Sequence, residues 1–273
     1  MTESQDASIF SLACGSAPLL ISIPHLGTRI PDDIAATMTE VARHADDTDW
    51  HLDRLYSFAA GMGASILTPI HSRYVIDLNR PPDDINLYPG RNTTGLLPTD
   101  TFDEAPLYRE GCMPDEQEKA RRRSLYWEPY HQALAQEIER IRAQHGYVLL
   151  WEAHSIRSQV PRLFEGRLPD FNFGTADGAS ALPGVIEKIS ADINARGQFS
   201  AVANGRFKGG YITRRYGDPG HGIHAIQLEM AQLTYMSESR PYAYRTEQAT
   251  QAAHVVRKAI DYALSEIGAQ YAR

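Results

Sequence analysis

The stretch Tyr147-Val148-Leu149-Leu150-Trp151-Glu152-Ala153-His154-Ser155 predicts a buried β-strand that ends in polar, reactive side chains. Its apolar run shows no polar alternation and follows Gly146, a residue that would end a preceding helix. In α/β proteins ligands bind at the carboxyl ends of strands, where side chains leave the sheet and face a crevice. Glu152 and His154 therefore lie where a functional site is expected.

Two other apolar runs end in the same way. Leu19–Pro24 leads to His25, and His224–Leu228 leads to Glu229. Three apolar strands that bring histidine and carboxylate side chains to one edge are typical of a metal-assisted hydrolase. The simpler interpretation is that each histidine is a capping or hydrogen-bonded residue and that Glu229 is a carboxylate at a helix start. The repetition of the pattern strengthens the metal interpretation.

The composition limits the classes of function. With 273 residues, 42% of them hydrophobic, the chain can bury a full core. A formal net charge of −7 gives no basic footprint, so no nucleic-acid partner is expected. No stretch approaches the length of a membrane span, and residues 1–6 lack the features of a signal peptide. Cys14 and Cys112 are too few for a disulfide framework, which favours a reducing compartment, the cytoplasm.

Strands alternate with helices along the chain, which predicts an α/β fold with a mainly parallel or mixed central sheet and helices on both faces. Further strands are expected over residues 64–68, 74–78 and 199–203. We expect one domain over residues 1–273, in which residues 1–15 form a loose arm or an edge segment. Residues 81–114 are rich in Pro, Gly, Asn and Asp, which is typical of a lid or a binding loop.

Residues typical of the starts and ends of helices lie between these strands. Thr48 is expected to cap a helix that begins at Asp49. A long helix is expected from Asp115 to Gly146, with Asp115 as its cap in a pattern that resembles a capping box with Glu118, and with a kink or break at Pro129. Two more helices are predicted over residues 183–195 and 245–267. Residues 157–177 and 204–222 are expected to be irregular, the latter because of its glycines.

Several motifs, by their order and spacing, resemble one family. They are Pro24–Gly27, Asp47–His51, Ser72–Pro81, Glu152–Ile156, Gln227–Glu229, Phe164–Pro169 and Lys208–Tyr211. Over about Pro18 to Met236 the chain resembles the N-formylglutamate amidohydrolase (N-formylglutamate deformylase) family. The resemblance implies a zinc-carboxypeptidase or phosphorylase-hydrolase-like α/β fold. It also implies hydrolysis of N-formyl-L-glutamate to formate and L-glutamate, late in histidine degradation.

Two positions depart from the family pattern. The usual Pro-His-Ser-Gly is here Pro-His-Leu-Gly, which removes a hydroxyl beside His25. The Asp that commonly precedes the second histidine by two residues is Glu152. A partner behind a metal ligand tolerates this extra methylene better than a direct ligand would. Neither change removes a candidate ligand.

Formamide hydrolysis needs a nucleophilic water, an electrophile at the carbonyl and a proton for the leaving amine. One Zn²⁺ ion with three protein ligands and an open position supplies the first two, although other divalent metals could serve. We expect His25 and His154 as two ligands and Asp49 as the third. Asp53, one turn further along the expected helix, competes with Asp49, and either could be only a charge at a helix start.

The resemblance also implies roles in catalysis and substrate binding. It places Glu229 as the general base that moves a proton from water to the leaving amine. Arg73 would then stabilise the tetrahedral oxyanion. Asn79 and Arg80 resemble the Asn-Arg pair that binds the terminal carboxylate in carboxypeptidase-like sites.

The second carboxylate of the substrate needs its own cationic partner. Arg214 is our candidate, with Gly210 beside it in the substrate site. The simpler interpretation of each arginine is an ion pair with a neighbour such as Asp77 or Asp218.

Other functions remain open at this point. The chain could be a deacylase or peptidase for another N-acyl acidic amino acid, or a non-catalytic protein that binds acidic metabolites. A phosphate-transferring enzyme would need a glycine-rich cradle that leads into a helix, and Gly209-Gly210 is a weak candidate for one. The sequence does not predict the oligomeric state.

Overall fold

A seven-stranded mixed sheet forms the centre of the structure, with strand order β1-β3-β2-β4-β7-β5-β6. The computed structural model describes residues 8–87, 90 and 92–272. The strands are β1 (Phe10–Ala13), β2 (Leu19–Ser22), β3 (Ser65–Pro69), β4 (Val148–Ile156), β5 (Phe171–Gly174), β6 (Ala201–Ala203) and β7 (Ile223–Ala231). This sheet confirms the α/β fold class expected from the sequence.

The four central strands run in one direction. β2 pairs in parallel with both β3 and β4, and β4 pairs in parallel with β7 over nine residue positions. The flanking strands β1 and β5 are antiparallel to β3 and β7 respectively. The carboxyl ends of β2, β4 and β7 therefore meet at one edge of the sheet, as the strand-end pattern required.

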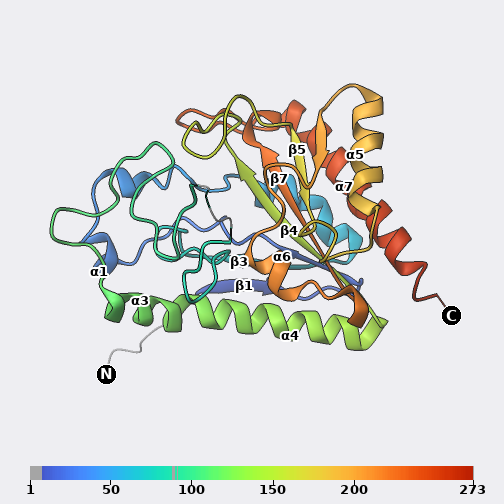
Figure 1. Ribbon diagram of the computed structural model, residues 1–273, viewed down its shortest axis with the longest axis horizontal. Coiled ribbons are helices and arrows are strands. Elements are labelled where there is room, and N and C mark those ends of the chain that lie inside the picture. Colours follow the sequence, from blue (N-terminus) through green and yellow to red (C-terminus); the bar gives the residue numbers. More distant parts are fainter. Residues whose placement is uncertain (1–7, 88–89, 91, 273) are drawn as a thin grey trace.

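Helices cover both faces of the sheet (Figure 1). One buried cluster joins the sheet to residues of α2, α5 and α7, and a second joins it to residues of α1, α4 and α6. The helices are α1 (Asp32–Ala35), α2 (Leu52–Leu55), α3 (Glu116–Arg122), α4 (Glu128–His145), α5 (Val185–Arg196), α6 (Tyr211–Tyr216) and α7 (Thr246–Gly268). Short helical turns are η1 (Val41–His44), η2 (Ser57–Met62), η3 (Arg123–Trp127), η4 (Pro219–His221) and η5 (Gln232–Thr234). Among the described residues, no helix combines the length and the apolar character needed to cross a membrane.

The period-two alternation of a strand decides which face carries the polar residues. In β4, Val148 and Leu150 pack in the cluster with α4, whereas Leu149 and Trp151 pack in the cluster with α7. By the same alternation Glu152 and His154 point toward the α4 and α6 side. Glu229 shares that side, because Ala225 of β7 packs there too.

The long predicted helix is divided by a π-helical turn. Asp115 accepts a hydrogen bond from the Glu118 N–H as the predicted cap, and Gly146 ends α4 in the left-handed conformation. The break falls at η3, directly before α4 and its Pro129. Proline has no N–H to bond the carbonyl four residues back, so the break predicted at this residue is confirmed.

Two predicted elements are wrong. Residues 74–78 are turns rather than a strand, because the Ser72 hydroxyl accepts the Tyr74 N–H and the Asp77 N–H bonds outside any ladder, to the Leu96 carbonyl. The helix expected from Asp49 begins only at Leu52, and no side chain caps it. The Asp49 N–H donates instead to the His25 carbonyl, which holds that residue in a turn outside the helix.

Two further segments differ from expectation, and the N-terminal segment agrees with one of its two expected forms. β5 lies in the stretch 157–177 that we expected to be irregular, and α6 lies in the expected glycine-rich loop. Of the arm expected over residues 1–15, Phe10–Ala13 form an edge strand, and residues 1–7 lie outside the described residues. The single-domain organisation of residues 1–273 stays a prediction.

Candidate active site

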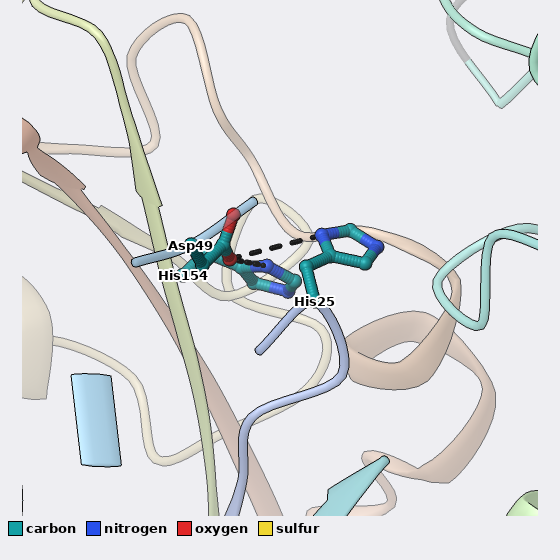
Figure 2. Close-up of side chains that lie close together, drawn as sticks. All are labelled: His25, Asp49 and His154. Carbon is teal, nitrogen blue, oxygen red and sulfur yellow. Dashed lines mark hydrogen bonds and ion pairs between the residues drawn. The ribbon is translucent and has the colours of Figure 1, made fainter. Parts of the chain in front are cut away.

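Three buried side chains converge at the carboxyl edge of the sheet: His25, Asp49 and His154 (Figure 2). One potential ligand atom from each lies within 4.8 Å of the other two. His25 follows β2, His154 lies within β4, and Asp49 lies on the turn before α2. The structure therefore brings together the three residues predicted as metal ligands.

Both imidazoles turn the same ring nitrogen toward one carboxylate oxygen. Asp49 Oδ2 lies 3.0 Å from His154 Nδ1 and 3.7 Å from His25 Nδ1. The ring centroids of the two histidines are 4.7 Å apart. Two imidazole nitrogens and a carboxylate oxygen are a common donor set for catalytic zinc, so these residues fit the proposed ion. Asp53 is exposed on α2 and does not join this cluster.

The Nε2 atom of each histidine, on the far side of the ring from Asp49, faces a second carboxylate. His25 Nε2 lies 2.7 Å from Asp77 Oδ1, and His154 Nε2 lies 2.7 Å from Glu152 Oε1. Carboxylates in this position fix the tautomer and orientation of metal-binding histidines. Glu152 is held in turn by the Thr213 N–H at 2.9 Å, which places it behind His154 as expected for the longer side chain.

Asp77 is a site residue that the sequence reasoning missed. From the sequence, Asp77 is expected only as an ion-pair partner for an arginine, within a predicted strand. Its buried carboxylate bonds His25, and it also accepts from Arg73 Nη2 at 2.7 Å and from the Asn79 N–H at 2.9 Å. The Asp-x-Asn spacing of residues 77–79, typical of a side chain that accepts an N–H two residues on, was the available signal.

The surroundings shift the pKa values of the two histidines in opposite directions. Burial and the nearby Arg73 lower the pKa of His25, outweighing its carboxylate neighbours. Burial also lowers the pKa of His154, but the hydrogen bonds that its ring donates to the carboxylates of Asp49 and Glu152 outweigh this effect and raise that pKa well above the usual value. Since a metal ligand must be deprotonated, a cation at this position competes with the proton on His154.

Glu229 lies beside this cluster on the neighbouring strand. Its Cα is the register partner of His154 in the β4–β7 ladder, and its side chain lines the same pocket as His25. Burial, reinforced by the negative charge of Asp49, raises the pKa of Glu229 to about 8, although His154 and Arg73 act to lower it. A carboxylate tuned toward neutral pH suits proton transfer.

Arg73 is the buried cation of the pocket. Its side chain lines the pocket, pairs with Asp77 and lies 5.1 Å from the ring centroid of Phe102. The ion pair fixes one edge of the guanidinium, a preorganised arrangement that suits stabilisation of a developing negative charge.

Asn79 and Gly210 are packed against each other. Asn79 Nδ2 lies 2.9 Å from His154 Nε2, and Asn79 Oδ1 accepts the Ile212 N–H of α6. A Cβ at Gly210 would lie 2.3 Å from Asn79 Nδ2, so only glycine fits there without displacement. Both residues line the pocket, and these contacts also give them a structural task.

The two remaining predicted arginines differ in position. Arg80 lines the pocket, and its Nε and Nη2 donate to the carbonyl and hydroxyl oxygens of Thr94. Arg214 is exposed on α6, bonds the Gly209 carbonyl and is not among the residues that line the pocket. Arg206 lines the pocket instead, and nothing in its local sequence drew attention to it.

Comparisons with known proteins accord with this site. The structure is an α/β protein with a histidine–carboxylate cluster at the carboxyl edge of its sheet, the donor set of metal-dependent hydrolases. Residues 17–236 match the family model described as N-formylglutamate amidohydrolase. The chain therefore belongs to the N-formylglutamate amidohydrolase family, which confirms the resemblance.

Relatives extend the match over almost the whole chain. It is 51% identical over 257 residues to an N-formylglutamate deformylase from Pseudomonas aeruginosa, covering 94% of this chain and 96% of the relative. It is 50% identical to one from Pseudomonas putida, covering 96% and 97%. A crystal structure of N-formylglutamate amidohydrolase from Ralstonia eutropha JMP134 shares the fold, with a TM-score of 0.79 at 24% identity over 94% of this chain and 99% of that one.

Proposed function

We propose that the protein is a zinc-dependent amidohydrolase that cleaves N-formyl-L-glutamate to formate and L-glutamate. The observation that carries this proposal is the convergence of His25, Asp49 and His154 beside Glu229, in a chain whose relatives are named N-formylglutamate deformylase. We further place the reaction in histidine degradation in the cytoplasm, as the family resemblance implies.

His25, Asp49 and His154 would hold one zinc ion. Zinc supplies a Lewis acid that polarises a carbonyl and makes water acidic near neutral pH. Asp77 and Glu152 hold the two imidazoles in the orientation that keeps both Nδ1 atoms directed at Asp49. Their role in the proposal is to keep the ligand set preorganised.

Glu229 is the proposed general base. Its carboxylate would accept a proton from the attacking water and deliver it to the nitrogen of the departing glutamate. Arg73 would stabilise the negative charge that develops on the former formyl oxygen. Asn79 and Arg80 would bind a substrate carboxylate, with Gly210 leaving room for Asn79 beside the substrate.

The test is formate release from N-formyl-L-glutamate by purified protein, before and after chelation and after zinc restoration. We expect activity to disappear on chelation and return with zinc. No formate from the zinc-loaded protein would refute the proposed substrate, and a panel of other N-acyl acidic amino acids would then separate a related deacylase from a binding protein.

A matched pair of variants tests the third ligand. Asp49→Asn should lose stoichiometric zinc, because the carboxylate facing both Nδ1 atoms becomes a neutral amide. Asp53→Asn should bind zinc like the wild type, since Asp53 is exposed outside the cluster. The reverse result would reassign the ligand.

A further inference from the structure

The loop between β6 and α6 is fixed against the rest of the protein. Asn204 Oδ1 accepts the Thr175 N–H at 2.9 Å, and the Lys208 carbonyl accepts the Ala176 N–H at 2.6 Å. Lys208 Nζ also pairs with Asp177 at 2.9 Å. The backbone on both sides of Arg206 is therefore anchored to the turn that follows β5.

The Arg206 side chain points from this loop into the pocket. Its Nε donates to the Leu163 carbonyl at 2.8 Å, and its guanidinium lies 5.3 Å from the ring centroid of Phe207. Arg206, Leu163 and Phe207 all line the pocket that contains His25 and Glu229. The bond to Leu163 fixes the edge of the guanidinium and so sets the direction of its fork.

A substrate with two carboxylates needs more than one cationic side chain in the pocket to bind it. Asp49 brings negative charge to the pocket, and Arg73 is already paired with Asp77. Arg80 and Arg206 are the other two arginines among the described lining residues. A substrate with two carboxylates can therefore engage one arginine with each.

Their neighbours decide which arginine takes which carboxylate. Arg80 lines the pocket and directly follows Asn79, whose amide contacts His154, so the backbone of Arg80 is tied to the reacting end of the pocket. The α-carboxylate of N-formylglutamate is attached to the carbon that bears the formamide nitrogen, so it must also lie near that end. Arg206 stands on a different loop beside the apolar Leu163 and Phe207, which suit the methylenes that lead to the side-chain carboxylate.

We propose that Arg206 binds the side-chain carboxylate of the substrate and so determines its specificity for glutamate, while Arg80 binds the α-carboxylate. This assignment rests on the proposed function. It replaces Arg214, which is exposed and does not line the pocket.

Three substrates test the assignment. N-formyl-L-glutamate carries both carboxylates, N-formyl-L-glutamine lacks the charge on the side chain, and 4-formamidobutanoate lacks the α-carboxylate. For Arg206→Met we expect kcat/KM to fall about 100-fold on N-formyl-L-glutamate and less than about threefold on N-formyl-L-glutamine, because only the first loses a charged partner. Arg80→Met should instead erase the preference for N-formyl-L-glutamate over 4-formamidobutanoate.

Conservative and distant variants sharpen the result. Arg206→Lys should lie between wild type and Arg206→Met, since the charge remains and the fork is lost. Arg214→Met should leave the glutamate-to-glutamine ratio unchanged, and a collapse of that ratio would place the clamp at Arg214. An equal loss on all three substrates in Arg206→Met would mean a structural role and overturn the inference. Failure of wild type to hydrolyse N-formyl-L-glutamate would instead refute the proposed function itself.

Discussion

Two regions build the candidate site in different ways. The strand edge carries His25, His154 and Glu229, whose positions follow from the parallel pairing of β2, β4 and β7. The turn segment of residues 72–80 carries Asp77 and Asn79, whose positions follow from hydrogen bonds to particular partners. The sheet presents the groups that would meet metal and water, and the turn segment holds those groups in orientation.

Because the strand edge and the turn segment are proposed to do different things, mutations in the two regions should have different effects on activity and metal binding. In the proposed mechanism a residue at the strand edge would supply an atom to the reaction, so its loss should remove a step. Asp77 in the turn segment acts through His25, so its loss should weaken the site and leave the step in place. The comparison fails if the two kinds of variant behave alike.

The largest effect should come from the two histidines. His25→Ala and His154→Ala should each lose stoichiometric zinc and essentially all formate release, because two protein ligands remain of three. Metal analysis of the dialysed protein, with circular dichroism as the control for folding, measures this. Zinc retained at one equivalent in either variant would disprove the ligand assignment.

Glu229→Gln should separate chemistry from metal binding. We expect kcat to fall by about 100-fold or more, because proton transfer by a positioned base contributes at least that much. Zinc content should stay at the wild-type level, since Glu229 is not a proposed ligand. Near-normal turnover would remove Glu229 from the mechanism.

Asp77→Asn tests the turn segment directly. The amide cannot accept the His25 Nε2–H and the Arg73 guanidinium as a carboxylate does. We expect zinc affinity to fall by about 10- to 100-fold, with turnover largely restored at saturating zinc. Glu152→Gln, the equivalent change behind His154, provides the comparison, and an irreversible loss of kcat in both would contradict an orienting role.

The smallest effect is on the stability of the metal-free protein. Burial raises the pKa of Glu229 from its usual range to about 8, so the folded state keeps a proton that the unfolded chain releases above about pH 4.5. Stability should therefore fall as pH rises through this window. Glu229→Gln removes that cost, so its free energy of unfolding should exceed that of wild type at pH 9 and should show no such gain at pH 4. Urea unfolding at both pH values checks the difference.

Much of the fold was predictable because apolar runs and helix signals are local. The strands that end near His25, His154 and Glu229 were expected, as were Asp115 as a cap and the break at Pro129. α6 was missed because its first N–H groups bond Asn79 and Glu152, which are remote in sequence. No local capping residue marks such a helix start.

The site was predictable to the same extent. The ligand candidates end apolar strands and could be found one by one, whereas the separation of Asp49 from Asp53 depended on a turn that the sequence did not reveal. The role of Asp77 was not predicted because the apolar residues around it have the sequence pattern of a strand. Arg206 was hidden because its place in the pocket depends on the fold of a distant loop.

The ladder of nine residue pairs between β4 and β7 fixes the distance between two residues of the site. His154 and Glu229 are register partners, so their backbones are held one interstrand spacing apart, about 4.8 Å. A slip of one residue would send Glu229 to the opposite face of the sheet, and every bond of the ladder would have to break together. The separation of the proposed ligand and the proposed base is thus fixed by the main chain, and a change of substrate would have to come from the loops around it.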